Sequence, residues 1–337
     1  MGLKITDLVH KKELKWEDLK NKKIAVDSSQ MLYQFATTIR QSDGTPLMDH
    51  KGRITSHLMG LMNRMPNLME KQIKLVFVFD GKPPILKLTE TEDREHRKRL
   101  AEEKLKQAKE EEDIEGMYKY SRQTVRITKE MTEDAKELIK AFGLPIVQAP
   151  SEAEAQASFM AEKGDVYAVS SSDYDCLVYG TPRLIYNLTA ATKKKLKDGG
   201  YVNVYPEMIE LKEVLSDLEI TQDQLLVLAI LTGTDYNKGG VRGIGPKTAL
   251  KLVKQHKNFD EIFKEVKADF NWKEIYAVFK SMPIMKNYQI KWSDPDSEKI
   301  KKILVDKHEF SEERVDNVLE RLEKREKGQK GLFEFGK

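Results

Sequence analysis

Three short apolar segments that each lead into an aspartate constrain the fold more than any other feature of this chain. The segments KKIAVD, KLVFVFD and VYAVSS are β-branched or near-continuously apolar, as strands buried on both faces are, and they lead into Asp27, Asp80 and Asp173. In open parallel α/β sheets the carboxyl ends of the strands share one edge, and ligands bind there. The sequence therefore predicts an α/β fold with a mostly parallel central sheet flanked by helices.

Three further carboxylates lie close to these segments in the sequence. Asp175 follows Asp173 at a spacing of two, so both side chains point the same way if the chain stays extended there. Glu152 and Glu154 open an alanine-rich run, EAEAQASFMAEKG, that has the composition of a helix. Residues two apart do not lie on the same side of a helix. Both glutamates can therefore contact the same ligand only if it lies ahead of the helix N-terminus.

Helix capping is a structural alternative for some of these acids. Ser151 is a candidate N-cap of the alanine-rich helix, and it would form a capping box with Glu154 three residues later. Asp27 precedes an amphipathic helix pattern, DSSQMLYQFATTIR, and it could cap that helix, as could Ser28 or Ser29. Capping leaves Glu152 without a role. The sequence around Asp27 alone is compatible both with a helix cap and with a role at the acid edge.

The grouped acids indicate a cation site. Carboxylates a few ångströms apart repel one another, and without cations they would take up protons. Mg²⁺ prefers oxygen ligands and keeps several of its waters, so some of the acids would act through water. Two such ions about 4 Å apart activate a water and stabilise the leaving oxygen of an in-line attack on a phosphodiester. The acid edge therefore predicts metal-dependent phosphodiester hydrolysis.

Composition places the chain among intracellular globular proteins. It has 337 residues, 39% hydrophobic, with no apolar run near the 18 that a membrane span needs and no secretory leader. Met1-Gly2 with Thr6 matches a loose myristoylation pattern, which we discount. The lone Cys176 excludes an internal disulfide. Because the net charge is only +3, a nucleic-acid surface must come from segregated charge.

Residues 82–130 differ from the rest of the chain. Pro83-Pro84 breaks regular structure, and opposite charges then recur at helical spacing with few apolar residues to bury. A salt-bridged solvent helix accounts for most of this segment. Basic residues nevertheless come soon after Asp80 and would overhang the acid edge where a phosphate approaches, namely Lys87, Arg94, Arg97 and Lys98.

A glycine turn follows the most apolar helix pattern of the chain. The segment TQDQLLVLAILTG predicts a buried helix that delivers Asp235, and Gly243 to Pro246 then read as a tight turn between two helices. Such a turn exposes backbone amides to a DNA phosphate or to a bridging monovalent cation. The alternative is an ordinary glycine C-cap with proline at N1. Lys247 and Lys251 favour the DNA interpretation.

Together these motifs resemble the structure-specific flap endonucleases of the archaeal and eukaryotic type, in the xeroderma-group-G and flap nuclease superfamily with its PIN-like fold. The resemblance covers nearly the whole chain through YQF, GRITSHLMG, VFVFDGKPP, QAPSEAEAQA, SSDYDCL, LTGTDYN and GIGPKTAL, in that order. It implies seven metal-site carboxylates: Asp27, Asp80, Glu152, Glu154, Asp173, Asp175 and Asp235. It further implies that Lys87 and Arg94 contact the scissile phosphate and that Tyr33 stacks on a base.

The same resemblance assigns the DNA-binding parts. Thr55 lies where the family's pocket for a one-nucleotide 3′ flap is lined, and Gly243, Gly245 and Lys247 lie where the downstream duplex is gripped. The implied organisation is a nuclease part (1–81 and 131–235), a helical arch (82–130) through which the 5′ flap threads, a helix-hairpin-helix and C-terminal DNA-binding part (236–326) and a tail (327–337).

Cofactors and partners follow from the family as well. They are two Mg²⁺ ions with Mn²⁺ as a substitute, a monovalent cation at the helix-hairpin-helix, and branched DNA with a 5′ flap. A monomer without membrane contact is expected, cytoplasmic in an archaeon and nuclear in a eukaryote. The expected activity is 5′ flap cleavage with 5′-3′ exonuclease activity, in Okazaki fragment maturation and repair.

The C-terminal tail fits most of a sliding-clamp peptide. Gln329, Leu332 and Phe335 match the pattern Q-x-x-L-x-x-aromatic-aromatic, but Gly336 replaces the second aromatic anchor, which should weaken the contact. The alternative for this tail is a frayed polar terminus.

Two other functions compete with flap cleavage. One is a related 5′ exonuclease or bubble-cutting repair nuclease, although those relatives usually carry longer chains than this one. The other is a non-catalytic binder of DNA junctions, which would be expected to have lost several of the seven carboxylates.

Overall fold

A seven-stranded sheet forms the centre of the computed structural model, which describes residues 5–190, 193–195 and 199–334. The strand order is β1-β9-β6-β5-β2-β3-β4; β6, β5, β2, β3 and β4 run parallel, and β9 is antiparallel to both of its neighbours, β6 and β1. The prediction of a mostly parallel sheet is confirmed. The strands are β1 (Lys12–Glu13), β2 (Lys23–Asp27), β3 (Lys74–Phe79), β4 (Ile146–Gln148), β5 (Ala168–Ser170), β6 (Arg183–Tyr186) and β9 (Glu207–Glu210).

The two faces of the sheet carry separate apolar cores. Along β3, Leu75, Phe77 and Phe79 belong to one core and Val76 and Val78 to the other, as the alternation of a strand buried on both faces requires. One face is covered by α1 (Ser28–Thr38), α2 (Ser56–Glu70), α5 (Lys129–Ala141), α13 (Ser297–Lys301) and α14 (Glu312–Glu334). The other is covered by α6 (Ala153–Glu162), α7 (Asp175–Val178), α8 (Leu211–Leu218) and α9 (Gln222–Thr232).

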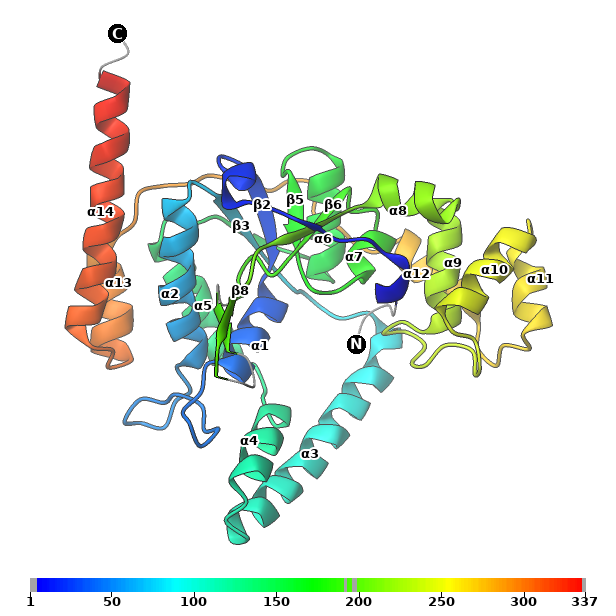
Figure 1. The fold of residues 1–337 in the computed structure, drawn as a ribbon, viewed down its shortest axis with the longest axis horizontal. Coiled ribbons are helices and arrows are strands. Elements are labelled where there is room, and N and C mark those ends of the chain that lie inside the picture. The colour runs from blue at the N-terminus through cyan, green and yellow to red at the C-terminus, as the bar shows by residue number, and fades with distance from the viewer. Residues whose placement is uncertain (1–4, 191–192, 196–198, 335–337) are drawn as a thin grey trace.

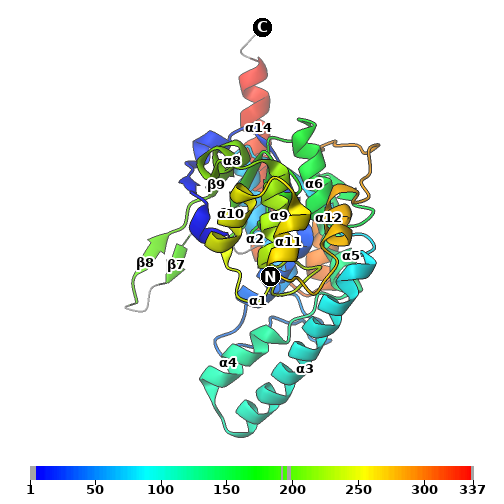
Figure 2. The same cartoon turned by 90° about the vertical axis from the view of Figure 1, so that its right-hand side faces the viewer.

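Three parts project from this layered body. The short helix η3 (Ile85–Lys87) leads into α3 (Leu88–Glu110), which with α4 (Ile114–Gln123) forms an antiparallel arch (Figure 1). The helices α10 (Pro246–Gln255) and α11 (Phe259–Glu265) lie beyond α9 at the far end of the molecule, and α12 (Trp272–Lys280) packs against α9. A hairpin of β7 (Lys193–Lys195) and β8 (Tyr201–Asn203) stands off the body (Figure 2). The run KKKLKDGG predicts a basic loop from its composition, and its first three residues form β7 instead.

Shorter elements complete the description. They are the 3₁₀ helices η1 (Thr6–Leu8) and η2 (Trp16–Leu19) and the π-helix η4 (Lys302–Lys307). No helix in the described part of the chain is both long enough and apolar enough to cross a membrane.

Helix α2 departs from what its sequence predicts. Proline disfavours a helix interior, so Pro66 predicts an interruption, but α2 runs without a break from Ser56 to Glu70 with Pro66 inside it and buried. A proline inside a helix costs about 3 kcal/mol through its missing N–H and its steric clash. The helix tolerates this cost because it buries Leu58, Leu61 and Met65 against neighbouring elements. Tertiary packing thus overrides the local signal.

The glycine turn also differs from its prediction. The two helices are not joined by a tight turn, because α9 ends at Thr232 and α10 begins at Pro246, so residues 233–245 form a longer connection. Gly233 is the C-cap of α9 with φ +107° and Gly243 has φ +83°, values that favour glycine. Pro246 occupies the first helical turn of α10, as the capping alternative predicted.

Replacing His57 with leucine is expected to flatten the acid side of the stability profile. Burial in α2 lowers the pKa of His57 to about 4, against the attraction of Asp134 and aided by the repulsion of His308. In the unfolded chain the imidazole titrates near its usual value of about 6.5. As the pH falls from about 6.5 to 4, the unfolded chain therefore takes up a proton that the folded chain refuses, which costs the native protein up to about 3 kcal/mol.

Urea unfolding between pH 7 and pH 4 measures this effect as the midpoint of each chain. The midpoint of the native chain should fall more steeply with acid than that of the His57→Leu variant. If the urea midpoints of the two chains fall equally with pH, His57 does not contribute to the acid sensitivity of the native chain.

Candidate metal centre

The predicted acids meet at the carboxyl edge of the sheet. Asp27 ends β2 and pairs with Val78 of β3, so Asp80 follows on the neighbouring strand. β5 pairs with the other side of β2 and ends three residues before Asp173. A cavity of about 760 Å³ opens at this edge. The expectation that parallel strands bring these aspartates together is confirmed by the register.

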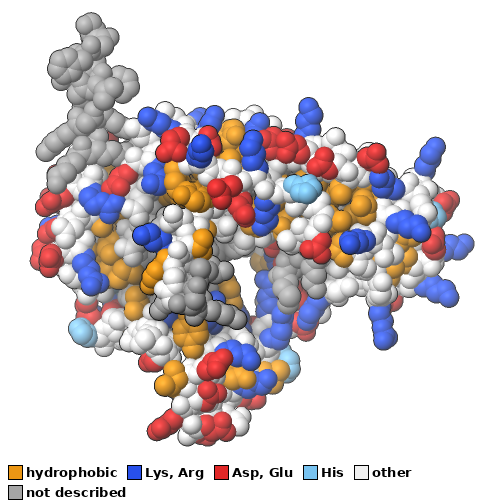
Figure 3. Space-filling view, in the orientation of Figure 1, with side chains coloured by type: hydrophobic (Ala, Val, Ile, Leu, Met, Phe, Trp, Pro, Cys, Tyr) orange, Lys and Arg blue, Asp and Glu red, His pale blue; other side chains and the backbone are white. Residues whose placement is uncertain are grey.

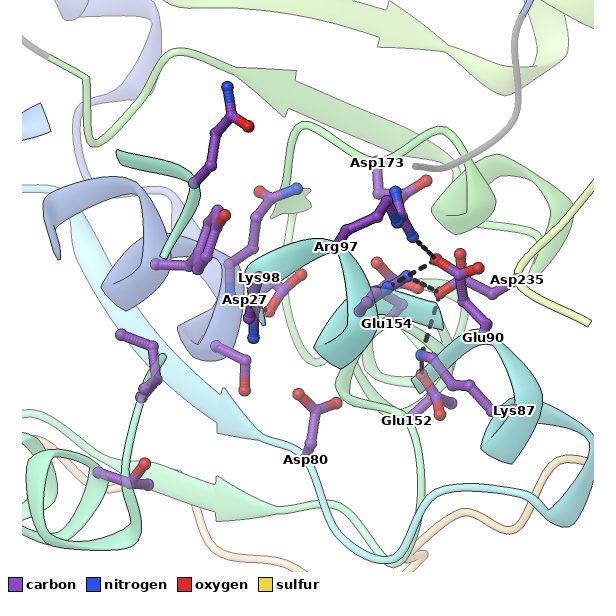
Figure 4. A pocket seen from close by; sticks show the side chains of 17 residues that line it. Asp27, Asp80, Lys87, Glu90, Arg97, Lys98, Glu152, Glu154, Asp173 and Asp235 are labelled. Atoms are coloured by element: carbon purple, nitrogen blue, oxygen red, sulfur yellow. Dashed lines mark hydrogen bonds and ion pairs between the residues drawn. The ribbon is translucent and has the colours of Figure 1, made fainter. Parts of the chain in front are cut away.

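Most of the predicted residues line this cavity. Those that do are Asp27, Tyr33, Asp80, Lys87, Arg94, Arg97, Lys98, Glu152, Glu154, Asp173 and Asp235. Figure 4 shows Lys87 beside Glu152 and near Asp235 at one side of the cavity, with Asp27 and Asp80 at the other. Two chemically opposite groups, carboxylates of the sheet edge and cations of the arch, therefore share one space.

Asp27 is both a helix cap and a member of the site. Its Oδ1 accepts the backbone N–H of Gln30 at 3.1 Å, and its Oδ2 accepts the Ser171 hydroxyl at 3.3 Å. Burial and the nearby Asp80 carboxylate raise the pKa of Asp27 to about 7. The two interpretations that the sequence left open are therefore compatible, because one oxygen caps α1 while the carboxyl group lines the cavity.

The N-terminus of α6 is organised by another strand and not by its own serine. The helix begins at Ala153 with Glu152 as N-cap, so the prediction of a Ser151 cap is wrong. The Oδ1 of Asp80 accepts the Ala153 N–H at 2.7 Å, and the Ser151 hydroxyl donates instead to the Lys82 carbonyl. A carboxylate from the neighbouring strand end fills the capping position, and both glutamates are left to face the cavity.

The backbone after β5 does not stay extended as expected. Asp175 begins α7, and its N–H donates to Oδ1 of Asp173 at 3.0 Å. Asp173 lines the cavity, whereas Asp175 is buried outside the lining, and its charge contributes to the raised pKa of Glu154. The spacing of two therefore places the second acid behind the first, because the chain turns into a helix at that point.

Two cations of the arch base contact the acids directly. The Lys87 ammonium contacts the Glu152 carboxylate and lies 3.3 Å from Oδ2 of Asp235. A terminal nitrogen of Arg94 donates to the same Asp235 oxygen at 2.8 Å. Burial opposes the charge of Lys87, but Glu152, Glu154 and Asp235 together hold its pKa above the usual value. The lysine therefore stays charged.

The electrostatics of the remaining acids fit a divalent cation. Burial, strengthened by the charges of neighbouring acids, raises the pKa of Glu154 and of Asp173. Burial also raises the pKa of Glu152 despite its contact with Lys87. Asp235 is the exception, because Lys87 and Arg94 outweigh its burial and lower its pKa. Buried carboxylates whose negative charge lacks compensation are stabilised by a hard divalent cation such as Mg²⁺ or Mn²⁺, which prefers carboxylate oxygens.

The acids are not converged on a single point. Within the described ranges, no group of three or more Asp, Glu, His or Cys side chains is arranged tightly enough to hold an ion as it stands. Lys87 lies between Glu152 and Asp235 and partly neutralises them. A metal ion at these two acids would have to displace the ammonium group.

The other predicted residues lie at several places. Tyr33 projects from α1 at the cavity with 42% of its surface exposed, so its ring is open to stacking. Thr55 is buried at the start of α2 and does not line the cavity. Gly243, Gly245 and Lys247 are exposed in and beside the turn before α10, away from the cavity. Basic side chains stand out over that end of the molecule in Figure 3.

The clamp residues are only partly covered by the structure. Gln329 and Leu332 lie within α14, but their side chains are outside the described set. Phe335 lies outside the described residues altogether. The predicted clamp peptide is therefore not tested by the fold.

Sequence reasoning missed two polar residues at the cavity. Glu90 lies in the first turn of α3, where it reads as an ordinary acid that complements the helix dipole. Gln30 accepts the Ser172 N–H at 2.7 Å through its side-chain oxygen and so ties α1 to the segment after β5. The partner of Gln30 is distant in sequence, and the Glu90–Arg94 spacing of four reads as an ordinary surface ion pair of a helix.

Known proteins with this arrangement are nucleases. Residues 3–101 match the XPG N-terminal domain and residues 143–235 match the XPG I-region. The chain is 52% identical to Flap endonuclease 1 of Pyrococcus abyssi over 325 residues, which cover 96% of this chain and 94% of the relative. It is 51% identical to the protein of that name from Pyrococcus furiosus, over 96% and 95% of the two chains.

Solved structures agree with the sequence relatives. Flap endonuclease-1 from Methanococcus jannaschii matches with a TM-score of 0.78 and 42% identity, over 97% of this chain and 100% of that one. The catalytic core of Rad2 in complex with DNA shares the fold, with a TM-score of 0.68 and 21% identity over 96% and 100% of the two chains. Because relatives about half identical span nearly the whole chain, and because the acid edge and arch have the arrangement expected of such nucleases, the chain belongs to the flap endonuclease family.

Proposed function

We propose that this chain is a structure-specific 5′ flap endonuclease that hydrolyses a phosphodiester where duplex DNA meets a 5′ single strand. The products would be a 3′-hydroxyl and a 5′-phosphate. The observation that carries this proposal is the cavity in which buried carboxylates of the sheet edge face cations from the base of a helical arch. The scissile phosphate needs both, because its metal ions bind to acids and its own negative charge attracts cations.

The metal ligands would come from the acids of the sheet edge. We assign the direct and water-mediated contacts to two Mg²⁺ ions, or to Mn²⁺ in their place, to Asp27, Asp80, Glu152, Glu154, Asp173, Asp175 and Asp235. When bound, the ions supply an activated water and charge stabilisation for the leaving oxygen. Asp175, which is buried behind Asp173, would act through water or through its charge.

Lys87 and Arg94 would exchange partners during the reaction. Each now neutralises Asp235, and both lie at the base of the arch above the cavity. A phosphate that enters the cavity would offer them a new anion, and the carboxylates would then be free to hold the metal ions. The two cations would then stabilise the extra negative charge of the transition state, and Tyr33 would stack on a base beside it.

DNA outside the cavity would contact three other parts. The arch of α3 and α4 would pass the 5′ single strand, with Arg97 and Lys98 as phosphate contacts at its base. The turn of Gly243 and Gly245 with Lys247 would bind the downstream duplex and would hold the monovalent cation there. Thr55, which is buried, would form part of the pocket for a 3′ flap.

Replacing Lys247 with alanine is expected to weaken duplex binding by a few-fold for all sequences alike. Lys247 is exposed in the first turn of α10, where its ammonium can reach a phosphate without contacting a base. Losing one phosphate contact should lower the slope of log K against log salt by about one. Fluorescence anisotropy of a labelled flap DNA over a salt series measures both values. An unchanged slope would place the duplex elsewhere.

The substrate class is tested with a panel of labelled DNAs. Native protein with Mg²⁺ should cut a double-flap DNA at one phosphodiester near the junction, faster than a bubble or a nicked duplex. Preferred cutting of the bubble would instead identify a bubble-cutting repair nuclease. Stepwise release of nucleotides from the nicked duplex alone would identify a 5′ exonuclease, and junction binding without any cutting would identify a non-catalytic binder.

The cellular setting is proposed on the same basis. Flap removal in Okazaki fragment maturation and repair fits the family, and the archaeal relatives favour a cytoplasmic monomer. The tail with Gln329, Leu332 and Phe335 would contact a sliding clamp. Gly336 should make that contact weak, because an aromatic anchor is missing.

A further inference from the structure

We propose that Glu90 is a positioning residue for cleavage: its carboxylate holds the Arg94 guanidinium by Nε, so that the terminal nitrogens face the metal-site carboxylates and the incoming phosphate. This inference rests on the proposed nuclease function and adds a residue to its reaction. Glu90 lies on α3 beside Asp235 and Arg97 (Figure 4).

The burial of Glu90 is unusual for its helix. Helix α3 is rich in charge and mostly exposed, and its buried residues are Glu90, Ala101 and Ala108. Only 5% of the Glu90 side chain is exposed. Glutamate is almost never fully buried unless it is paired. An acid that only complements the helix dipole gains about 0.3–1 kcal/mol at the surface and does not need burial.

Two arginines share one oxygen of Glu90. Its Oε1 accepts from Nε of Arg94 at 2.8 Å and from a terminal nitrogen of Arg97 at 3.0 Å. Positions 90, 94 and 97 lie one and two helical turns apart on one face of α3, so the three side chains form a row. The row is directed into the cavity, which all three residues line.

The second oxygen of Glu90 argues against stability as the reason for the residue. Oε2 is buried, and no described residue hydrogen-bonds to it. A buried acceptor without a partner costs about 1–3 kcal/mol, and more when it is charged. A surface ion pair on the same helix would stabilise the arch without this cost. A buried site that keeps an unsatisfied carboxylate is more readily explained by a requirement of the reaction.

The geometry of the guanidinium explains what that requirement is. A guanidinium carries five N–H donors in one rigid plane. Glu90 takes the Nε side, and one terminal nitrogen donates to Asp235 at 2.8 Å. When a phosphate replaces Asp235 as partner, the Glu90 contact can persist. The Arg94 guanidinium then keeps its orientation. Without Glu90, Arg94 keeps its charge but loses one of the two carboxylate contacts that fix its orientation.

A double-mutant cycle with single-turnover cleavage of flap DNA tests this coupling. Glu90→Ala alone should slow cleavage about tenfold, because a displaced catalytic group is costly, and Arg94→Ala alone about 10²-fold. The double variant should match Arg94→Ala within about twofold, since Glu90 acts through Arg94. Equilibrium binding of the flap DNA with EDTA present should stay within about twofold of native, which a collapsed arch would not allow.

The controls separate this inference from its alternatives. Glu92→Ala, at an exposed position of the same helix, should cleave as native. If Glu90→Ala does not fold, Glu90→Gln takes its place in the double-mutant cycle with Arg94→Ala. Native rates in the Glu90 variant, or effects of the two substitutions that multiply, would overturn the inference. An inert native chain would instead overturn the proposed function, so the two failures are distinguishable.

Discussion

Replacing Asp173 with alanine is expected to slow flap cleavage by at least about 10³-fold while leaving DNA binding nearly unchanged. Asp173 lines the cavity beside β2, and its raised pKa reflects burial among other acids. A metal ion contributes several kcal/mol of charge stabilisation in the transition state, which corresponds to about 10³-fold in rate. Removal of a carboxylate also removes negative charge that repels DNA, so the substrate should bind at least as tightly.

Single-turnover cleavage with Mg²⁺ and anisotropy binding without it measure the two effects. The matched control is Asp217→Ala, which removes an exposed acid from α8 and should cut at the native rate. A variant that binds and cuts as native would show that Asp173 is not a ligand. Native and variant chains that both bind without cutting would show that the acid edge has no catalytic role.

Replacing Lys87 with alanine is expected to slow cleavage by about 10²-fold or more, with little change in DNA affinity. The ammonium contacts Glu152 and Asp235 where the phosphate must arrive, and it is held charged by these acids. A preorganised donor in a partly desolvated site is worth about 10²–10³-fold in rate. In the ground state the lysine exchanges carboxylates for phosphate, so most of its contribution should appear only in the transition state.

The exposed Lys82, five residues earlier, is the control for Lys87. Lys82→Ala removes the same charge just before the arch and should have a small effect on the rate. Equal losses in the two variants would mean that only the overall positive potential matters. A loss of DNA affinity equal to the loss of rate in Lys87→Ala would mean that the lysine binds substrate and transition state alike.

The near-continuous apolar runs of the sequence were sufficient to predict the parallel core of the central sheet. Runs such as KLVFVFD are apolar on both faces, and only a strand covered by helices on both sides accommodates them. The three-residue β4 and the antiparallel β9 were not predicted, because short strands carry too few residues for a periodic signal. They join the sheet through neighbours that are distant in sequence.

The cap of α6 could not be predicted from local sequence. A serine ahead of an alanine-rich helix is a strong local signal, yet the cap of α6 is the Asp80 carboxylate from the end of β3. Similarly, Pro66 remains inside α2 because burial of the helix outweighs the lost hydrogen bond. In both cases a tertiary contact worth a few kcal/mol overrides a local preference of about 1–3 kcal/mol.

The sequence by itself determined the sheet, the charged arch and the identity of the acids, since strand periodicity and residue chemistry are local properties. Only the tertiary structure decided how the acids share space with cations. It placed Lys87 between Glu152 and Asp235, buried Asp175 behind Asp173, and turned Glu90 of a solvent-facing helix inward onto Arg94. These contacts join residues up to 148 positions apart, between Lys87 and Asp235. Burial and charge at such a meeting point depend on all the elements that converge there, so no segment carries the information alone.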